Sequence, residues 1–171
     1  MLDPDIRNEI VAFTRELVAL PSLPGREREV ALAVEARMRR LDYDEVWIDE
    51  FGSVAGIRRG TGPGPAVLFD SHTDTVEVTS LPEWKHDPFG GELSDGRIWG
   101  RGSTDMKGAL AATVLTIGRL PREEFRGTII VSGSVGEEVI EGEALSHVVA
   151  RVRPDFVVIC EPSECRLGIG Q

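Results

Sequence analysis

The chain has 171 residues, which is the size of one domain and enough to bury a substantial core. With 41% hydrophobic and 28% charged residues, it has the composition of an ordinary soluble globular protein. The formal net charge of −10 argues against nucleic acid and against an anionic membrane surface as partners.

Helical periodicity dominates the N-terminal part of the chain. Apolar residues recur at helical spacing over 5–20 and again over 27–41, and the run 21–25, rich in proline and glycine, separates the two predicted helices. Short strands joined by a turn are then predicted at 45–48 and 54–57. This part of the chain therefore predicts two helices followed by a pair of strands.

The rest of the chain alternates strands with helices. A buried strand is predicted at 66–70 and an irregular segment at 79–98. The remaining predicted elements are a helix at 106–119, a strand at 127–133, a helix at 142–152 and a strand at 155–160. This order predicts an α/β fold in which a mixed, largely parallel central sheet carries helices on both faces.

No segment predicts export or membrane insertion. The N-terminus, 1–5, is acidic and lacks the positively charged start and apolar stretch of a secretory signal. No window approaches the length of a membrane span. Cys160 and Cys165 flank a predicted turn, and we interpret them as reduced thiols rather than as a redox pair or a thiolate metal site. The predicted location is therefore the cytoplasm.

Acidic and imidazole side chains follow the predicted strands. His72, the pair Glu137 and Glu138, and Glu161 each come just after a strand, and Asp105 precedes a helix in a glycine-rich segment. Because ligands of open α/β sheets bind beyond the carboxyl ends of the strands, one fold can bring all five residues to one sheet edge. Hard and borderline ligands of this kind are what a hydrolytic metal site needs.

The adjacent carboxylates of Glu137 and Glu138 are the most informative of these groups. Consecutive side chains diverge, so one carboxylate can bind a metal while its neighbour faces water or substrate. The alternative interpretation is a solvated turn.

Each of the other residues also has a structural interpretation. His72 and Asp74 point the same way in extended backbone, so Asp74 can accept the ring N–H of His72, and the alternative is a surface histidine with an acidic neighbour. Asp105 could be a plain helix N-cap, and Glu161 could simply end a strand. We interpret Lys107 as a solvated residue or a member of a structural ion pair.

Five short motifs carry a family resemblance. They are Ser-His-Thr-Asp-Thr-Val at 71–76, Trp-Lys-His-Asp-Pro-Phe at 84–89, the glycine-rich run at 100–108, Gly-Glu-Glu at 136–138 and Cys-Glu-Pro-Ser at 160–163. In order and spacing they resemble the co-catalytic zinc exopeptidase and deacylase family, which includes succinyl-diaminopimelate desuccinylase, acetylornithine deacetylase, aminoacylase and carboxypeptidase G. The resemblance covers almost the whole chain, and the ending 161–171 is most similar to a subgroup labelled selenium-metabolism hydrolases.

The resemblance implies a role for each metal-site residue. His72, with Asp74 behind it, and Glu161 would bind one metal, and Glu138 would bind the other. Asp105 would bridge both metals, and the peptide bond after it is commonly cis in the family. The cofactors implied are two divalent ions, Zn²⁺ first, with Co²⁺ or Mn²⁺ as alternatives.

The resemblance also implies the chemistry, which is hydrolysis of amide bonds in N-acyl amino acids or small peptides. Glu137 would be the general base, which takes a proton from the attacking water and later delivers one to the leaving amine.

The chain departs from the family pattern at its C-terminal end. It stops at Gln171, before the fifth ligand of the family, a distal histidine, and before the inserted lid or dimerisation domain through which a longer parent could form a homodimer. We therefore expect 1–171 to be the N-terminal portion of the catalytic domain, inactive by itself, with apolar surface or a strand edge left uncovered. The alternative is a non-catalytic metal-binding or interaction fragment derived from such an enzyme.

Overall fold

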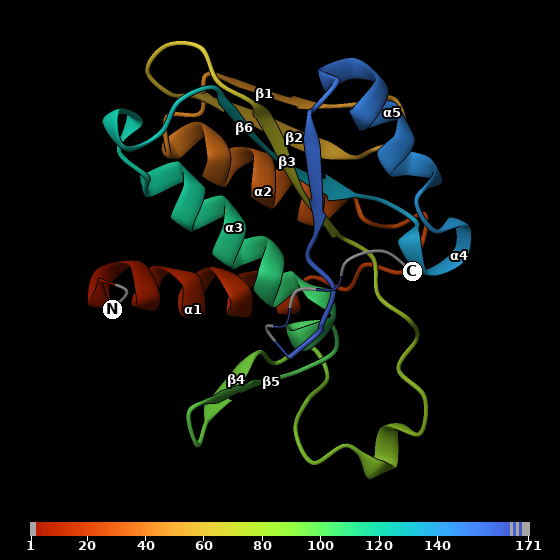
Figure 1. Cartoon of the computed structure of the whole chain (residues 1–171). Helices are drawn as coiled ribbons and strands as arrows, with labels where there is room; N and C mark the ends of the chain where they lie inside the picture. The colour runs from red at the N-terminus through yellow and green to blue at the C-terminus, as the bar shows by residue number, and fades with distance from the viewer. Residues whose placement is uncertain (1–2, 165, 167, 169–171) are drawn as a thin grey trace.

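A five-stranded mixed sheet with the order β1-β2-β6-β3-β7 forms the centre of the computed structural model, which describes residues 3–164, 166 and 168 (Figure 1). The strands are β1 (Glu45–Ile48), β2 (Val54–Arg59), β3 (Ala66–His72), β6 (Thr128–Ser134) and β7 (Phe156–Ile159). The β1, β2 and β6 strands pair antiparallel, whereas β6, β3 and β7 pair parallel. The parallel half therefore places the carboxyl ends of three strands at one edge of the sheet.

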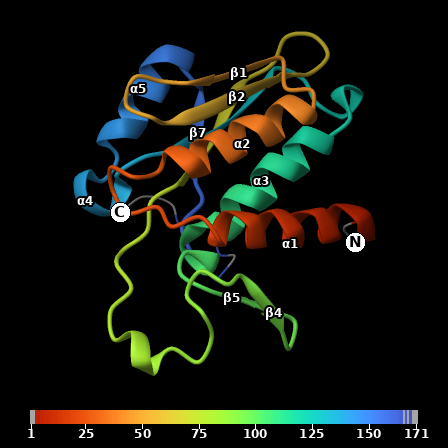
Figure 2. The same cartoon turned by 180° about the vertical axis from the view of Figure 1, so that it is seen from behind.

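Helices cover both faces of this sheet (Figures 1 and 2). One face carries α1 (Pro4–Val18), α2 (Arg28–Arg40) and α3 (Gly108–Arg119), whose apolar sides form the larger core cluster with residues of β2, β3 and β6. The other face carries α5 (Glu143–Val152), which buries Val148 against the sheet. Successive residues of a strand point to opposite faces, so the strands contribute to both clusters. The predicted α/β fold class is confirmed.

The segment 79–98, which we expected to be irregular, contains regular structure. Its second half leads into a hairpin of β4 (Glu92–Ser94) and β5 (Arg97–Trp99). The hairpin turns at Asp95 and Gly96, whose φ angles of 52° and 71° are both positive, as a two-residue type I′ turn requires. The Asp-Gly pair was a hairpin signal in the sequence, and the prediction of an irregular segment was wrong there.

Three short helical turns also lie outside the predicted elements. They are η1 (Leu81–Glu83), η3 (Arg122–Glu124) and α4 (Glu137–Ile140). The third long helix begins at Gly108 rather than at Met106, because Asp105 and Met106 have non-helical dihedral angles within the preceding turn η2 (Ser103–Lys107). The sequence pattern therefore placed the start of the helix two residues too early.

The β7 strand lies at an edge of the sheet and leaves apolar side chains uncovered. Phe156, Val157 and Ile159 are 62%, 42% and 49% exposed. The expectation of uncovered apolar surface along a strand edge is thus confirmed for the described part of the chain, and such an edge favours association with other strands.

Two other expectations concern membranes and thiols. None of the helices in the described ranges is long and apolar enough to span a bilayer. Cys160 is a free, half-buried cysteine, and Cys165 lies outside the described residues.

Arg58, in β2, is buried and donates to carbonyl oxygens at the C-terminal ends of two helices. Its Nη1 atom donates to the carbonyl oxygens of Leu41 at 3.0 Å and Gly118 at 2.9 Å, and Nη2 donates to that of Leu120 at 2.7 Å. Because hydrogen bonds to charged groups contribute about 1.5–3 kcal/mol each, we expect Arg58→Met to lower the free energy of unfolding by at least about 3 kcal/mol. Urea unfolding measures this change. The exposed Arg59 is the control, since loss of its surface ion pair in Arg59→Met should cost less than about 1 kcal/mol. Equal losses in the two variants would contradict the role of Arg58.

Candidate metal centre

The parallel strands bring the predicted site residues to one edge of the sheet. In the β3–β6 ladder His72 lies opposite Ser134, the last residue of its strand before the turn that carries the glutamate pair. In the β3–β7 ladder Asp70 lies opposite Ile159, so Glu161, two residues further on, comes level with His72. The strand register therefore explains why residues far apart in the chain meet here.

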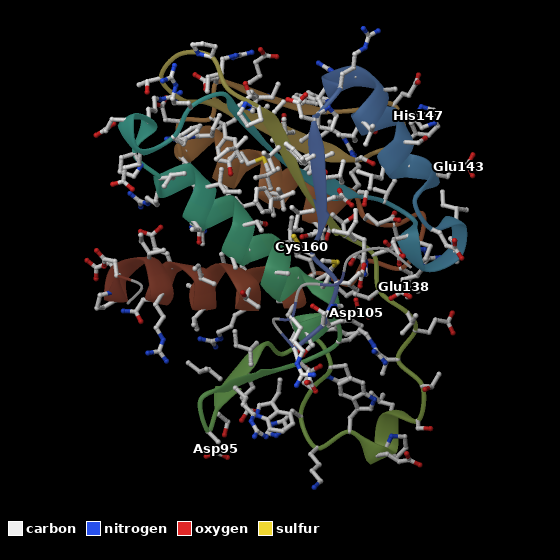
Figure 3. The ribbon with its side chains drawn as sticks, viewed as in Figure 1. Asp95, Asp105, Glu138, Glu143, His147 and Cys160 are labelled. Atoms are coloured by element: carbon white, nitrogen blue, oxygen red, sulfur yellow. The ribbon has the colours of Figure 1, made fainter. Side chains whose placement is uncertain are left out.

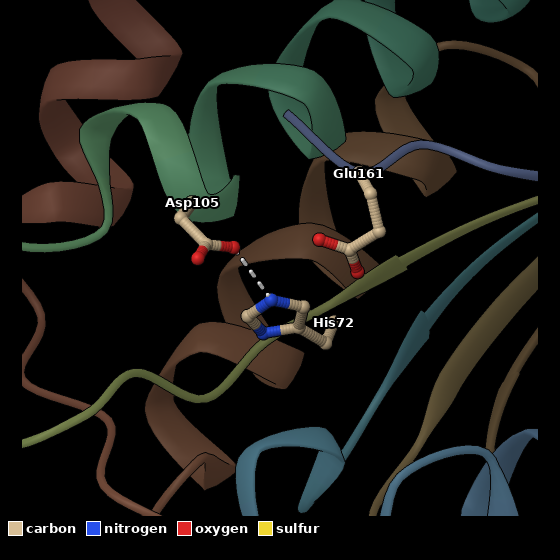
Figure 4. Close-up of side chains that lie close together, drawn as sticks. All are labelled: His72, Asp105 and Glu161. Carbon is tan, nitrogen blue, oxygen red and sulfur yellow. Dashed lines mark hydrogen bonds and ion pairs between the residues drawn. The ribbon is translucent and has the colours of Figure 1, made fainter. Parts of the chain in front are cut away.

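The imidazole of His72 is buried, and its two nitrogens have different partners, of which Figure 4 draws Asp105. Its Nδ1 atom lies 3.0 Å from the backbone carbonyl oxygen of Asp74 and 3.5 Å from the carboxylate Oδ1 of the same residue. Its Nε2 atom lies 2.9 Å from Oδ1 of Asp105 and 4.0 Å from Oε2 of Glu137. One nitrogen is thus held by a neighbour while the other faces acidic groups, which is the usual arrangement of a metal-binding histidine.

His72, Asp105 and Glu161 form a compact group of candidate ligands. One ligand atom of each residue lies within 4.8 Å of those of the other two, and within the described residues this is the one such group of three (Figure 4). The imidazole is buried, whereas the two carboxylates are exposed to solvent. The donor set is therefore one imidazole and two carboxylates that remain open on one side.

The charges in this region favour a cation. Burial by itself lowers the pKa of His72, but the hydrogen bonds to Asp74 and Asp105 outweigh it and raise this pKa to about 9. Burial raises the pKa of Glu161, and the charge of Asp105 raises it further while His72 opposes it. These shifts follow from acidic groups held close together, and they favour positive charge among them, whether from a proton or from a metal ion.

Glu138 lies beside this group without belonging to it. Burial raises the pKa of its carboxyl group, and the charge of Asp105 raises it further. Figure 3 shows Glu138 and Asp105 near each other beyond the end of the sheet. All the predicted ligands therefore gather in one region, and the charge of Asp105 acts on both Glu161 and Glu138.

The carboxylate of Asp74 is fully buried and holds the turn that carries the glutamate pair. Its Oδ1 accepts from the amide of Glu137 and its Oδ2 from the amide of Glu138, each at 3.1 Å. Burial alone would raise the pKa of Asp74, but its hydrogen bonds to His72 and to the backbone lower it. We expected this carboxylate to accept the ring N–H of His72. Its Oδ1 lies 3.5 Å from Nδ1 of His72, and the backbone carbonyl of Asp74 lies nearer, at 3.0 Å, because the carboxylate also faces the two amides.

Lys107 is not solvated and has no ion-pair partner among the described residues, contrary to our interpretation of the sequence. It is fully buried, and its Nζ donates to the carbonyl oxygen of Leu20 at 2.7 Å. Burial lowers its pKa to about 8. It follows Asp105 and Met106, whose connecting peptide bond is cis, as the family resemblance implied. Lys107 therefore ties the segment that carries Asp105 to the residues that follow α1.

Two buried polar residues near the site were missed by the sequence analysis. Ser22, which is 1% exposed, donates to the carbonyl oxygen of Thr73, and Glu27, which is 5% exposed, accepts from the amide of Gly136. A serine in a proline-rich loop and a glutamate at the start of a helix are both ordinary in a sequence. No local signal therefore marked these residues.

Comparison with known proteins relates the motifs to one family. The family model described as Peptidase family M20/M25/M40 matches residues 68–170, which include every predicted site residue. The uncharacterized protein YgeY of Escherichia coli (strain K12) is 34% identical over 98% of this chain and 42% of its own length. Succinyl-diaminopimelate desuccinylase of Acidiphilium cryptum (strain JF-5) is 34% identical over 94% of this chain and 43% of its own length. The chain thus spans less than half the length of these relatives.

Solved structures share the fold. Sso-CP2, an M20 family metallo-carboxypeptidase from Sulfolobus solfataricus, aligns with a TM-score of 0.75 and 22% identity over 92% of this chain and 37% of that protein. The YXEP protein of Bacillus subtilis, described as a dinuclear metal binding peptidase from the M20 family, aligns with a TM-score of 0.69 and 17% identity over 92% of this chain and 43% of that protein. At these identities the likeness establishes the α/β architecture.

Proposed function

The chain belongs to the peptidase family M20/M25/M40, and from this premise we propose that it is the N-terminal portion of the catalytic domain of a metal-dependent hydrolase that cleaves amide bonds. The observation that carries the proposal is the compact group of His72, Asp105 and Glu161 with Glu137 beside it. Since the curated relatives are more than twice as long as the part they share with this chain, we assign the activity to a longer protein.

The residues present fit a divalent cation. An imidazole and two carboxylates within 4.8 Å of one another are a suitable donor set for zinc, for which three protein ligands and an open position are typical of catalytic sites. The Nε2 atom of His72 faces this group, and the other ring nitrogen is already occupied by Asp74. We propose that His72, Asp105 and Glu161 hold one ion, with Zn²⁺ preferred and Co²⁺ or Mn²⁺ as alternatives.

A second ion would be held by Asp105 and Glu138. The charge coupling between these two carboxyl groups supports this assignment, because a shared cation would relieve their repulsion. The description of the Bacillus subtilis YXEP protein as a dinuclear metal binding peptidase supports a pair of ions as well. With only two carboxylates from this chain, the second position would bind its ion more weakly than the first.

Glu137 is the residue of this chain best placed to move protons. Bound divalent cations would supply Lewis acidity, which polarises an amide carbonyl and makes water more acidic. The Oε2 atom of Glu137 lies 4.0 Å from Nε2 of His72, and 35% of the side chain is exposed, so the carboxylate faces both the ligand group and the solvent. We assign Glu137 to accept a proton from the attacking water and to donate one to the leaving amine nitrogen.

The proposed substrates are N-acyl amino acids or small peptides. The names of the relatives support this class, since a desuccinylase and a carboxypeptidase both cleave an amide bond next to a small acyl or amino-acid unit. The exposed side of the ligand group is compatible with such a substrate.

Metal analysis of the dialysed chain tests the proposed site. We expect about one tightly bound Zn²⁺ per chain, because three protein ligands suffice for a site of this type while the second position has only two. His72→Ala should abolish this binding, since His72 is the one imidazole of the group. Absence of tight binding in the unmodified chain would overturn the proposed site.

The second candidate function is a metal-binding fragment without catalytic activity. It is favoured because, among the residues that the structure describes, one group of three candidate ligands is compact and Glu138 lies outside it. Hydrolysis of N-acyl amino acids and dipeptides, measured for the isolated chain and for the longer protein, distinguishes the two functions. We expect negligible turnover by the isolated chain and metal-dependent turnover by the longer protein. Two tightly held ions and robust turnover by the isolated chain would contradict the weak second position.

A further inference from the structure

The segment between α1 and α2, here called the 20–27 loop, contacts three of the four segments that carry the candidate metal centre; the fourth, which carries Glu161, follows β7. Both of its ends are anchored in the core, because Leu17 and Val18 at the end of α1 and Val30 at the start of α2 are fully buried. Protein cores are closely packed and resist deformation. A loop fixed in this way can therefore hold other segments in position.

The first contact is with the strand end that carries His72 and Asp74. The Oγ atom of Ser22 donates to the carbonyl oxygen of Thr73 at 2.7 Å, and the carbonyl oxygen of Ser22 accepts from the amide of Thr75 at 2.8 Å. Ser22, Thr73 and Thr75 are all at most 1% exposed. Because water cannot replace these bonds without opening the structure, they fix the backbone on both sides of Asp74.

The second contact is with the turn that carries the glutamate pair. The Oε1 atom of Glu27 accepts from the amide of Gly136 at 3.1 Å, and the next two amides, of Glu137 and Glu138, donate to Asp74. Two buried carboxylates thus take up three consecutive amides of one turn. The orientation of the proposed general base and of its neighbouring ligand depends on this turn.

The third contact is with the segment that carries Asp105. The Nζ atom of Lys107 donates to the carbonyl oxygen of Leu20, the first residue of the 20–27 loop. The three contacts therefore reach within two residues of Asp74, Glu137 and Asp105.

We propose that the 20–27 loop sets the relative positions of the segments that carry His72, Asp105 and Glu138, with Ser22 and Glu27 as its positioning residues. The inference rests on the proposed function, since it assigns these residues to the same metal centre. Neither residue would touch the metal or the substrate. Hydrogen-bond partners that orient metal ligands typically change metal affinity about 10–100-fold when they are removed.

The test compares four variants of the 171-residue chain. Ser22→Ala removes the Oγ donor, Glu27→Ala removes the acceptor for Gly136, and Glu27→Gln keeps an acceptor oxygen of the same reach. The matched control is Tyr43→Phe, which removes another buried side-chain bond to a carbonyl, from Tyr43 Oη to Val114 at 2.9 Å, near the opposite end of the sheet. Circular dichroism and urea unfolding establish that each variant is folded under the assay conditions.

Two measurements are made on each variant. The first is Zn²⁺ affinity by competition with a chromophoric chelator, together with the visible absorption spectrum of the Co²⁺-loaded chain, which reports ligand geometry. The second is hydrogen exchange of the amides of Gly136, Glu137, Glu138 and Thr75 in the metal-free chain. We expect Ser22→Ala and Glu27→Ala to lower Zn²⁺ affinity about 10–100-fold and to alter the Co²⁺ spectrum. Glu27→Gln should restore most of the affinity, and Tyr43→Phe should change neither quantity.

The exchange data separate this inference from the proposed function. If the unmodified chain binds no metal, the proposed function is overturned, and faster exchange at these amides in Ser22→Ala and Glu27→Ala still supports the positioning role. If the unmodified chain binds metal while both alanine variants keep its affinity, Co²⁺ spectrum and exchange rates, the positioning role is overturned. If Tyr43→Phe lowered Zn²⁺ affinity as much as the two alanine variants do, the positioning role would also be overturned, because the loss of affinity would then reflect reduced stability alone.

Discussion

Replacing Glu137 with alanine is expected to lower the turnover number of the longer protein about 10²–10⁴-fold, which is the usual contribution of general acid–base catalysis. The metal content should stay unchanged, because Glu137 lies outside the group formed by His72, Asp105 and Glu161. Steady-state hydrolysis of an N-acyl amino acid, paired with metal analysis of the same sample, measures both quantities. The expected signature is a loss of turnover without a loss of metal.

Two further variants sharpen this test. Glu137→Gln keeps the size of the side chain and removes its basicity, so it should be as inactive as the alanine variant. Glu143→Ala removes an exposed carboxylate from the first turn of α5 and should leave turnover unchanged. If Glu137→Ala lost metal together with activity, then Glu137 would be a ligand, and its role would be shared with or exchanged for that of Glu138.

Asp74→Ala is expected to weaken both the metal centre and the fold. The carboxylate is fully buried and accepts from the amides of Glu137 and Glu138, so alanine would leave two buried donors without a partner. At about 1–3 kcal/mol for each unsatisfied donor, we expect the free energy of unfolding of the metal-free chain to fall by roughly 2–6 kcal/mol. Zn²⁺ affinity should fall at least about 10-fold, because His72 also loses its carboxylate neighbour.

Urea unfolding and chelator competition on the same preparation check these two expectations. Asp74→Asn is the matched control, since its amide keeps one acceptor oxygen for the turn and should give an intermediate loss of stability. The backbone carbonyl of Asp74 that faces Nδ1 of His72 is present in every variant. A loss of stability or of Zn²⁺ affinity therefore results from removal of the carboxylate. Unchanged stability and unchanged affinity in Asp74→Ala would contradict the role assigned to it.

The sequence pattern was sufficient to predict the architecture. Helical spacing predicted α1, α2, α3 and α5, and apolar runs predicted the strands of the sheet, because burial of one side of each element imposes a regular spacing of apolar residues. The spacing of apolar residues did not predict features that depend on the backbone dihedral angles of one or two residues. The start of α3 depends on two non-helical residues, Asp105 and Met106, and the β4–β5 hairpin depends on the positive φ angles at Asp95 and Gly96.

The sequence by itself determined which residues are available for chemistry. A histidine or carboxylate at the carboxyl end of a parallel strand lies at one edge of the sheet, so the meeting of His72 and Glu161 follows from topology. Asp105 joins them from the turn before α3. Only the tertiary structure decided what supports them. The carboxylate of Asp74 turns to the amides of Glu137 and Glu138, and the 20–27 loop reaches three distant segments. These hydrogen bonds join residues that lie far apart in the chain, and no sequence pattern predicts them. Their partners depend on how the segments pack in three dimensions and not on local spacing.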